Sequence, residues 1–591
     1  NNQGQDSPNS SGLTFVQNKV TITDASFTSK TVAGSIATVA INGFADVTIQ
    51  GSGLSNLGLS DGTGNVKIDL GSLTNQPNNK TLDLTLKGVT AGFDLSNAYT
   101  TVNLNTGSGT SNPVFLSSLQ DSALTTLNIS GAENISLPNL SGASSLRTLD
   151  YTGTGTITAN TSNVSVANIN AKNAASATIT MDASKTSYQG GAGQDNIILT
   201  GGIPSQVIAL GDGNDSLDIS AIAVPSGGID AGDGFDSLIA SSEQLGSLSS
   251  TNGILSGFES LTISGALTGQ TLDASRLGAI KNVTLAQGGS YNITNLANFS
   301  NIQLSQPGVK YSFSEVPHVE GRFNTISLSL INSTTGPVDF ASTGVSLENV
   351  EKATITLTHT SGTPSTLFDS LELSGKSLAA LNLVSNNGIN LTETSDALTF
   401  VDGSKISAGG LNFTGGKGIL YVTGSQVAGS TNNIGLSSAT NSITYVGGAG
   451  NDNIVVNKKN NIVTVGTGSD SVTITEQGVF LSNFTTITDP HPGLTINMLD
   501  TGTERFDRNQ VILSASATFN DYANATVVQI SSQDSNGAFG WFQFGGSTYL
   551  VEARQATGQY FFQGYDAIIK LTGLVDLSNA LFNNTHSLTL V

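Results

Sequence analysis

Hydrophobic and polar residues alternate along most of the chain, in short runs that are separated by turn-forming residues. Residues 19–23 (Lys-Val-Thr-Ile-Thr) and 81–86 (Thr-Leu-Asp-Leu-Thr-Leu) are clear examples, and Gly, Asn and Ser gather between such runs. A period of two among Thr, Val, Ile and Leu is typical of strands that bury one face. From Leu13 onward the pattern therefore predicts an all-β chain.

A loose apolar unit recurs and is followed each time by Gly or Asn. It is written Leu124-x-x-Leu127-x-Ile129, Phe258-x-x-Leu261-x-Ile263 and Leu378-x-x-Leu381-x-Leu383. Short coils with inward apolar residues and turns at the corners predict a β-solenoid, in which each rung covers the next. A leucine-rich repeat is disfavoured because its strict period is missing. For residues 15–188, where the repeat is weak, a Greek-key sandwich remains an alternative.

Composition narrows the class of protein further. The chain holds 68 Gly, and its net charge is −21 with only 11% charged residues. Such an acidic chain does not suit a nucleic-acid partner, which demands a cationic face, but it suits divalent cations. The chain contains no Cys, so stability must come from packing or from metal. No apolar run approaches the roughly 20 residues that cross a bilayer, so no transmembrane segment is expected.

The sharpest motif is Gly190-Gly191-Ala192-Gly193-Gln194-Asp195-Asn196-Ile197-Ile198, which fits the calcium repeat G-G-x-G-x-D-x-U-x. Two related turns follow at residues 211–217 and 232–238, and a second block occupies residues 447–454 and 466–472. Residues 189–240 and 441–475 are therefore expected to be calcium-binding β-rolls. The expected metal-site residues are Gly191, Gly193, Asp195, Gly211, Asp212, Gly213, Asn214, Asp215, Asp230, Gly232, Asp233, Gly234, Asp236, Gly448, Gly450, Asn451, Asp452, Gly466, Gly468 and Asp470.

The coordination chemistry of calcium explains the residue types in this motif. Ca²⁺ takes six to eight oxygens from carboxylates and backbone carbonyls in a flexible cage. Glycine permits the positive-φ turn that lets the backbone approach an ion, and the terminal Asp supplies charge. The spacing from Asp195 to Asp215 to Asp236 is about one coil, so successive turns should stack along one edge and share ions.

Enzymatic constellations are not expected. No H-E-x-x-H motif occurs, and the four His residues are scattered. Gly58-Leu59-Ser60-Asp61-Gly62 matches the G-x-S-x-G elbow, but that motif requires a strand-to-helix turn, and no helix is predicted there. The chain is therefore expected not to be an enzyme.

The C-terminal region is rich in aromatic residues: Phe539, Trp541, Phe542, Phe544, Tyr549, Tyr560, Phe561, Phe562 and Tyr565. A solenoid needs a cap over its last apolar rung, and bulky aromatics serve this purpose. Stacking against carbohydrate is the alternative. The cap is the favoured interpretation.

The two calcium blocks resemble those of RTX-type surface-layer proteins of Gram-negative bacteria. Residues 541–551 (Trp-Phe-Gln-Phe-Gly-Gly-Ser-Thr-Tyr-Leu-Val), 566–574 and Phe258-Glu259-Ser260-Leu261 are also similar to segments of that family. The resemblance covers residues 189–265 and 441–591. It implies type I secretion through a C-terminal signal, calcium-triggered folding outside the cell, and a calcium-dependent two-dimensional lattice. It also implies anchoring to lipopolysaccharide by an N-terminal module. No such module is found in this sequence, so a separate anchoring protein or domain is the alternative.

The expected organisation has six parts: a polar linker (1–14), an N-terminal β domain (15–188), the first β-roll (189–240), a central β-solenoid (241–440), the second β-roll (441–475), and an aromatic cap with the secretion signal (476–591). The linker start suggests that an upstream segment has been removed. The expected function is that of a secreted, self-assembling surface-layer protein with Ca²⁺ as its ligand. An RTX adhesin, or the calcium-binding domain of a larger secreted protein, is the alternative.

Overall fold

The computed structural model is almost entirely β, with 54% of residues in strands and 5% in helices. This confirms the predicted fold class. The structure describes residues 18–28, 34–70, 80–109, 113–202, 205–223, 228–244, 247, 255–265, 271–277, 280–306, 310–317, 323–332, 336–337, 339–360, 368–475, 481, 484–498, 505–531, 538–554, 560–561, 563, 565–583 and 586–591. The expected linker at residues 1–14 lies outside these ranges.

The chain divides into two compact units. Unit 1 consists of Asn1–Thr262 and Arg276–Ala279, and unit 2 consists of Ile263–Ser275 and Ile280–Val591. The first predicted β-roll falls in unit 1 and the second in unit 2. The six sequence-based boundaries remain predictions.

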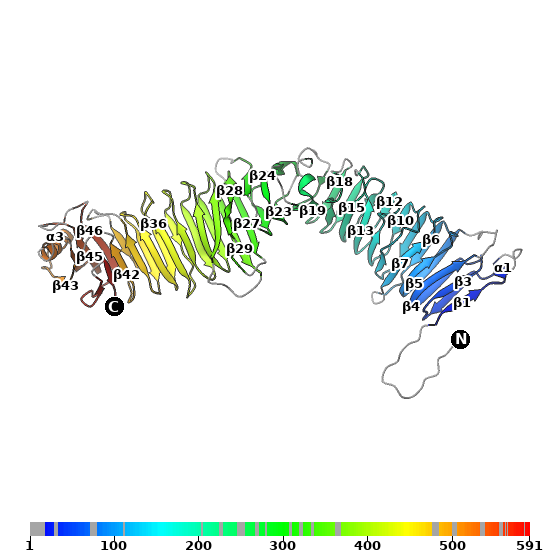
Figure 1. The fold of residues 1–591 in the computed structure, drawn as a ribbon, viewed down its shortest axis with the longest axis horizontal. Coiled ribbons are helices and arrows are strands. Elements are labelled where there is room, and N and C mark those ends of the chain that lie inside the picture. Colours follow the sequence, from blue (N-terminus) through cyan, green and yellow to red (C-terminus); the bar gives the residue numbers. More distant parts are fainter. Residues whose placement is uncertain are drawn as a thin grey trace, which may run out of the picture. The chain divides into compact units, whose positions relative to one another are not determined.

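Unit 1 is a parallel β-solenoid whose rungs contribute one strand to each of two faces (Figure 1). It begins with β1 (Val20–Thr23), α1 (Ala25–Thr28), β2 (Thr38–Asn42), β3 (Val47–Gln50) and the long strands β4 (Asn56–Asp69) and β5 (Thr81–Asp94). One face continues through β6 (Thr101–Asn105), β8 (Thr126–Ser130), β10 (Thr148–Tyr151), β12 (Asn168–Asn170), β14 (Ser187–Gln189), β16 (Ile208–Asp212), β18 (Ile229–Asp233) and β20 (Leu255–Ser256). The other face holds β7 (Val114–Gln120), β9 (Ile135–Leu137), β11 (Thr156–Asn160), β13 (Ser176–Asp182), β15 (Gln194–Thr200), β17 (Ser216–Asp218) and β19 (Ser237–Ala240). After these come η1 (Ser242–Gln244) and β21 (Ser260–Ile263).

Alternating side chains explain how these rungs stack. In β8, Leu127 and Ile129 are fully buried, and they pair in parallel register with Leu149 and Tyr151 of β10. Every strand pairing described within unit 1 is parallel, whereas a Greek-key sandwich is antiparallel. Among the described residues of this region, the solenoid is therefore the correct interpretation.

Unit 2 repeats this arrangement with its own two faces. One face contains β23 (Asn282–Leu285), β25 (Ser300–Leu304), β27 (Thr325–Asn332), β29 (Lys352–His359), β31 (Ala380–Ser385), β33 (Phe400–Ile406), β35 (Tyr421–Thr423), β37 (Thr444–Gly448), β39 (Ile462–Gly466) and β41 (Thr485–Ile487). The other contains β22 (Thr271–Asp273), β24 (Ser290–Leu296), β26 (Lys310–Glu315), β28 (Asp339–Glu348), β30 (Phe368–Ser374), β32 (Gly388–Glu393), β34 (Leu411–Thr414), β36 (Thr431–Leu436), β38 (Asn451–Val456), β40 (Ser471–Ile474) and β42 (Thr495–Met498). The short helix η2 (Ala274–Leu277) follows β22.

Polar side chains also follow the rung repeat. The amide groups of Asn453, Asn433 and Asn412 each donate to the asparagine one rung earlier, at 2.9, 2.6 and 2.6 Å, and the series ends at Asn390. Because each amide is both donor and acceptor, such a row adds side-chain hydrogen bonds to the backbone ladder. The row therefore helps to hold four successive rungs in register.

The C-terminal region closes the last rung of unit 2. It contains β43 (Arg505–Val511), α3 (Phe519–Ser531), β44 (Ala538–Phe544), β45 (Ser547–Ala553), β46 (Ala567–Thr572), β47 (Leu581–Phe582) and β48 (Ser587–Thr589). Strand β46 extends one face by pairing with β41, and β48 runs antiparallel to β42 on the other. Helix α3 begins with a reciprocal cap, because the Thr518 hydroxyl accepts the Asp521 amide and the Asp521 carboxylate accepts the Thr518 amide.

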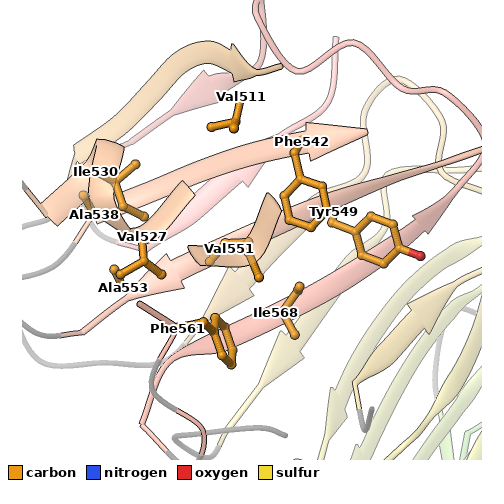
Figure 2. Packing of buried hydrophobic residues seen from close by; sticks show 11 residues of the cluster. Val511, Val527, Ile530, Ala538, Phe542, Tyr549, Val551, Ala553, Phe561 and Ile568 are labelled. Carbon is orange, nitrogen blue, oxygen red and sulfur yellow. The ribbon is translucent and has the colours of Figure 1, made fainter. Parts of the chain in front are cut away.

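The predicted aromatic cap is confirmed. Phe539, Trp541 and Phe542 are at most 2% exposed, and Phe542 stacks on Tyr549 with ring centroids 5.1 Å apart. Val527 and Ile530 of α3 lie over the same cluster as Phe542 and Val551 (Figure 2). Tyr560 and Tyr565 are more than half exposed, and Phe562 lies outside the described residues. Most of these aromatic residues therefore serve as the core of the cap.

No helix among the described residues is long and apolar enough to cross a membrane. Gly58–Gly62 lies inside strand β4, which continues to Asp69. The G-x-S-x-G match is thus not at a strand-to-helix turn.

Candidate cation-binding turns

Three aspartates of the first block stack inside unit 1. Asp195, Asp215 and Asp236 are 1%, 2% and 0% exposed, and they occupy equivalent positions at the start of β15, β17 and β19. The Asp195 amide donates to Asp215 Oδ1 at 2.8 Å, and the Asp215 amide donates to Asp236 Oδ1 at 2.7 Å. Each carboxylate therefore binds the backbone of the rung before it. We call this row the aspartate ladder.

Protein groups complete both ends of the aspartate ladder. Asp195 accepts the Ala177 amide at 2.9 Å and the Tyr188 hydroxyl at 2.7 Å, so both of its oxygens are bonded. At the other end, the Asp236 amide donates to Glu259 Oε2 at 2.9 Å. Glu259 is thus a fourth carboxylate in this row. In the sequence, residues 258–261 stand out only by their similarity to surface-layer proteins, and this similarity does not predict a carboxylate at this place.

Two buried carboxylate oxygens of the ladder lack a protein donor. Asp215 Oδ2 and Asp236 Oδ2 have no hydrogen-bond partner among the described residues. Burial, with the nearby carboxylates of Asp195, Asp236 and Asp212 adding to it, raises the pKa of Asp215 to about 7. Burial likewise raises the pKa of Asp236, with Glu259 contributing. Buried anionic oxygens without donors are unfavourable unless a cation or a proton compensates them.

The glycines of these turns allow the backbone of successive rungs to touch. Gly211 and Gly232 have φ of 108° and 97°, and a Cβ would lie 2.2 Å from the Gly191 carbonyl oxygen at Gly211 and 1.8 Å from the Gly211 oxygen at Gly232. Gly213 and Gly234 are packed in the same way against the rung before. The stacked turns therefore form a column of closely spaced carbonyl groups beside the aspartate ladder.

The other predicted residues of this block face outward. Asp212 and Asp233 are exposed and adjacent in register. Asp230 is exposed and accepts a hydrogen bond from Ser256, and Asn214 accepts the Phe235 amide at 2.9 Å. The structure thus separates the inward acids from an outer acidic edge, a division that the linear motif does not reveal.

The second block in unit 2 has the same construction. Asp452 and Asp470 are 0% and 2% exposed, and the Asp452 amide donates to Asp470 Oδ1 at 2.8 Å. Gly466 packs against Gly448 and Gly468 against Gly450, with a Cβ placed 1.8 and 2.1 Å from the respective carbonyl oxygens. Asn451 accepts the Ser469 amide at 3.0 Å, as Asn214 does in the first block.

The carboxylates of the second block, however, already have protein donors. Tyr445 and Asn432 each donate to Asp452 Oδ1 at 2.6 Å, and Asp470 Oδ2 lies 2.8 Å from His491 Nε2. Burial raises the pKa of both aspartates, and the hydrogen bonds from Tyr445 and His491 oppose that increase. Of the two blocks, the first therefore fits a divalent cation better.

Tyr188 and Tyr445 belong to a longer shared motif. Residues 188–195 and 445–452 both read Tyr-x-Gly-Gly-Ala-Gly-x-Asp, and in both the hydroxyl bonds the aspartate seven residues later. Extending the calcium motif by two residues toward the N-terminus reveals this tyrosine. The partners Asn432, His491 and Glu259 lie one rung away and have no fixed spacing that would identify them.

Acidic side chains alone do not form a metal cage here. No group of three or more His, Asp or Glu side chains converges within the described ranges. Carbonyl oxygens from the glycine turns would have to supply most of the ligands, which Ca²⁺ accepts readily.

Comparison with known proteins adds no assignment: no protein-family model matches this chain, and no curated protein matches it significantly.

Proposed function

We propose that this chain is a structural protein of a bacterial surface layer, which is stabilised by calcium outside the cell and assembles into a two-dimensional lattice. The observation that carries the proposal is the aspartate ladder, whose two buried oxygens lack donors beside a column of glycine carbonyls. Both units repeat one arrangement of stacked parallel strands, which is the architecture of a scaffold. This repetition favours a structural role over catalysis.

Asp215 and Asp236 would hold the ion, together with carbonyl oxygens of the glycine turns. Bound Ca²⁺ would neutralise the buried carboxylates and link neighbouring rungs. Without it, the ladder opposes folding, because Asp215 and Asp236 each bury a carboxylate oxygen that has no donor. Extracellular sites with dissociation constants of roughly 10⁻⁴–10⁻³ M stay empty in the cytosol and fill outside. Folding would then follow export, since an ion that binds only the folded state stabilises it by mass action.

Assembly would use the acidic surface. The net charge of −21 makes copies repel one another, and the outer pair Asp212 and Asp233 places two carboxylates side by side on the solvent face. Calcium between such edges would turn repulsion into adhesion between copies. Attachment to the cell would involve lipopolysaccharide or a separate anchoring protein, and export would use the C-terminal region at residues 476–591.

The test is a calcium titration of the purified chain after EGTA treatment, followed by circular dichroism, light scattering and electron microscopy. We expect added β-structure and then sheet-like particles in the submillimolar to millimolar range. A chain that gains structure but stays monomeric would favour an RTX adhesin or a domain of a larger secreted protein. Equal β-structure and equal particle size in EGTA and in calcium would refute the proposal.

A further inference from the structure

A turn three rungs before the aspartate ladder lies in the same column of unit 1. It consists of Gly131-Ala132-Glu133-Asn134, between β8 and β9. Parallel register connects the two places step by step: Ile135 pairs with Ile157, Ile157 with Ala177, and Ala177 with Asp195. Ile135 therefore occupies the position that Asp195 fills three rungs later.

The backbone of this turn is built like the predicted calcium turns. Gly131 has a φ of 108°, the same as Gly211. The Ala132 amide donates to the Gly107 carbonyl at 2.7 Å, as the Asp212 amide does to the Gly191 carbonyl at 2.6 Å. Since a Cβ at Gly131 would lie 2.8 Å from the Gly107 oxygen, the rungs approach too closely here for a side chain at this position.

The outer asparagine is also in its expected place. Asn134 accepts the Thr156 amide of the next rung at 2.9 Å, as Asn214 and Asn451 do for Phe235 and Ser469. Residues 131–135 (Gly-Ala-Glu-Asn-Ile) thus match residues 448–452 (Gly-Ala-Gly-Asn-Asp) in structure, with the acid moved from the fifth position to the third.

The relocated acid is buried and lacks a donor. Glu133 is 1% exposed, and neither Oε1 nor Oε2 has a hydrogen-bond partner or an ion pair among the described residues. Its carboxylate faces the turn before it, where Oε1 lies 3.0 Å from the Cβ position of Gly109 and 3.9 Å from that of Gly107. A buried carboxylate aimed into a glycine turn without any donor is unfavourable by itself.

We propose that the Glu133 turn is a further divalent-cation site. The carboxylate supplies the charge. The carbonyl oxygens of Gly107 and Gly131 accept one hydrogen bond each, from Ala132 and Thr154, and each retains a second lone pair. The buried Ile135 fills the fifth position, so the carboxylate comes from the third position and faces Gly107 and Gly109 of the preceding turn. The inference rests on the proposed function for the identity of the ion, Ca²⁺.

The first test counts bound calcium on the full chain by equilibrium dialysis. Glu133→Gln removes the charge and keeps the size. Glu243→Gln changes an exposed acid of the same unit. The ladder variant, Asp215→Asn with Asp236→Asn, removes the two carboxylates of the aspartate ladder that have an oxygen without a donor. We expect Glu133→Gln to bind one ion fewer than wild type and Glu243→Gln to bind the same number. An undiminished count for folded Glu133→Gln would overturn the site. A ladder variant that loses no ions would instead contradict the proposed function.

The second test does not depend on the folding of the Glu133 variant. Hydrogen exchange of a peptide covering residues 126–137 is measured in the ladder variant, with EGTA and with excess calcium. We expect calcium to slow exchange in this peptide at least tenfold, because the Glu133 turn keeps its own ion. Equal exchange in the two conditions would overturn the proposal.

Discussion

Replacing Asp215 by asparagine should have opposite consequences with and without calcium. The pKa of Asp215 is raised from 3.8 to about 7, chiefly by burial. At about 1.36 kcal/mol per pKa unit, the uncompensated carboxylate costs about 4 kcal/mol above pH 7. Asparagine removes that cost, but its amide leaves a buried N–H₂ group without an acceptor, at about 1–3 kcal/mol. In EGTA we therefore expect Asp215→Asn to be more stable than wild type by about 1–3 kcal/mol.

Calcium should change this order. At a free concentration of 100 times its dissociation constant, an ion bound only by the folded state adds about 2.7 kcal/mol to wild type. We expect most of this gain to be lost in Asp215→Asn. The assay is hydrogen exchange of peptides covering residues 194–218, since local opening free energies can be assigned to single rungs. The only tryptophan lies in unit 2 and does not report on unit 1.

Asp470→Asn is the matched control. Its carboxylate already bonds His491 and the Asp452 amide, so calcium should change its local stability less than that of the ladder. An Asp215→Asn variant that is less stable than wild type in EGTA, or that gains as much from calcium, would refute the reasoning.

Three further predictions concern other parts of the structure. Glu315 is 1% exposed, and burial, with Glu351 adding to it, raises its pKa to about 8, so the folded state binds this proton more tightly than the unfolded state does. The stability of unit 2 in EGTA should therefore fall by up to about 5 kcal/mol as pH rises from about 4.5 to 8. Glu315→Gln should reduce this pH dependence, as measured by hydrogen exchange of β26. An unchanged pH dependence would show that Glu315 is not its source. Gly232→Ala should destabilise the turn by more than about 2 kcal/mol in local exchange, because a Cβ would meet the Gly211 oxygen, whereas Gly228→Ala, where a Cβ meets nothing within 4 Å, should not. Ile530→Ala, at a fully buried site in α3, should lower the stability of the cap by about 2–5 kcal/mol, as measured by denaturation followed through Trp541 fluorescence. Val528→Ala, at a half-exposed site of the same helix, should have little effect. Equal effects of the two variants would mean that α3 does not pack as described.

The sequence predicts the strands and the first-block turns well because both depend on short patterns. The alternation that buries Leu127 and Ile129 is visible within residues 124–129. The glycine–aspartate motif likewise predicts a tight turn from a few adjacent residues. Pairing between rungs is predictable only as an average spacing. Glu259, Asn432 and His491 bond the stacked aspartates of the two blocks from neighbouring rungs. Their local sequence contains no pattern that predicts these contacts.

Two features were missed for different physical reasons. The calcium motif does not detect Glu133, because the motif requires an aspartate at the fifth position of residues 131–135, and Ile135 stands there. The carboxylate of this turn comes from the third position instead. Helix α3 was not predicted because the composition of the whole chain favours strands. Thr518 and Asp521 nevertheless have the spacing of a helix cap. The exposure of Asp212 and Asp233 depends on which way the strand faces at the turn, which a one-residue shift would reverse.

The return of β48 to β42 has a kinetic consequence. Partners on neighbouring rungs of the solenoid bodies are separated by about 18 to 34 residues, as for Asp452 with Asp470 and Tyr311 with Val345. The body of each solenoid can therefore form by successive local steps despite its β content. The Thr495–Thr589 contact spans 94 residues and must close a much longer loop. We therefore expect the last rung to be sealed late in refolding: the circular-dichroism signal of the rungs should recover before the fluorescence of Trp541, and simultaneous recovery would show that closure of the cap is not the slow step.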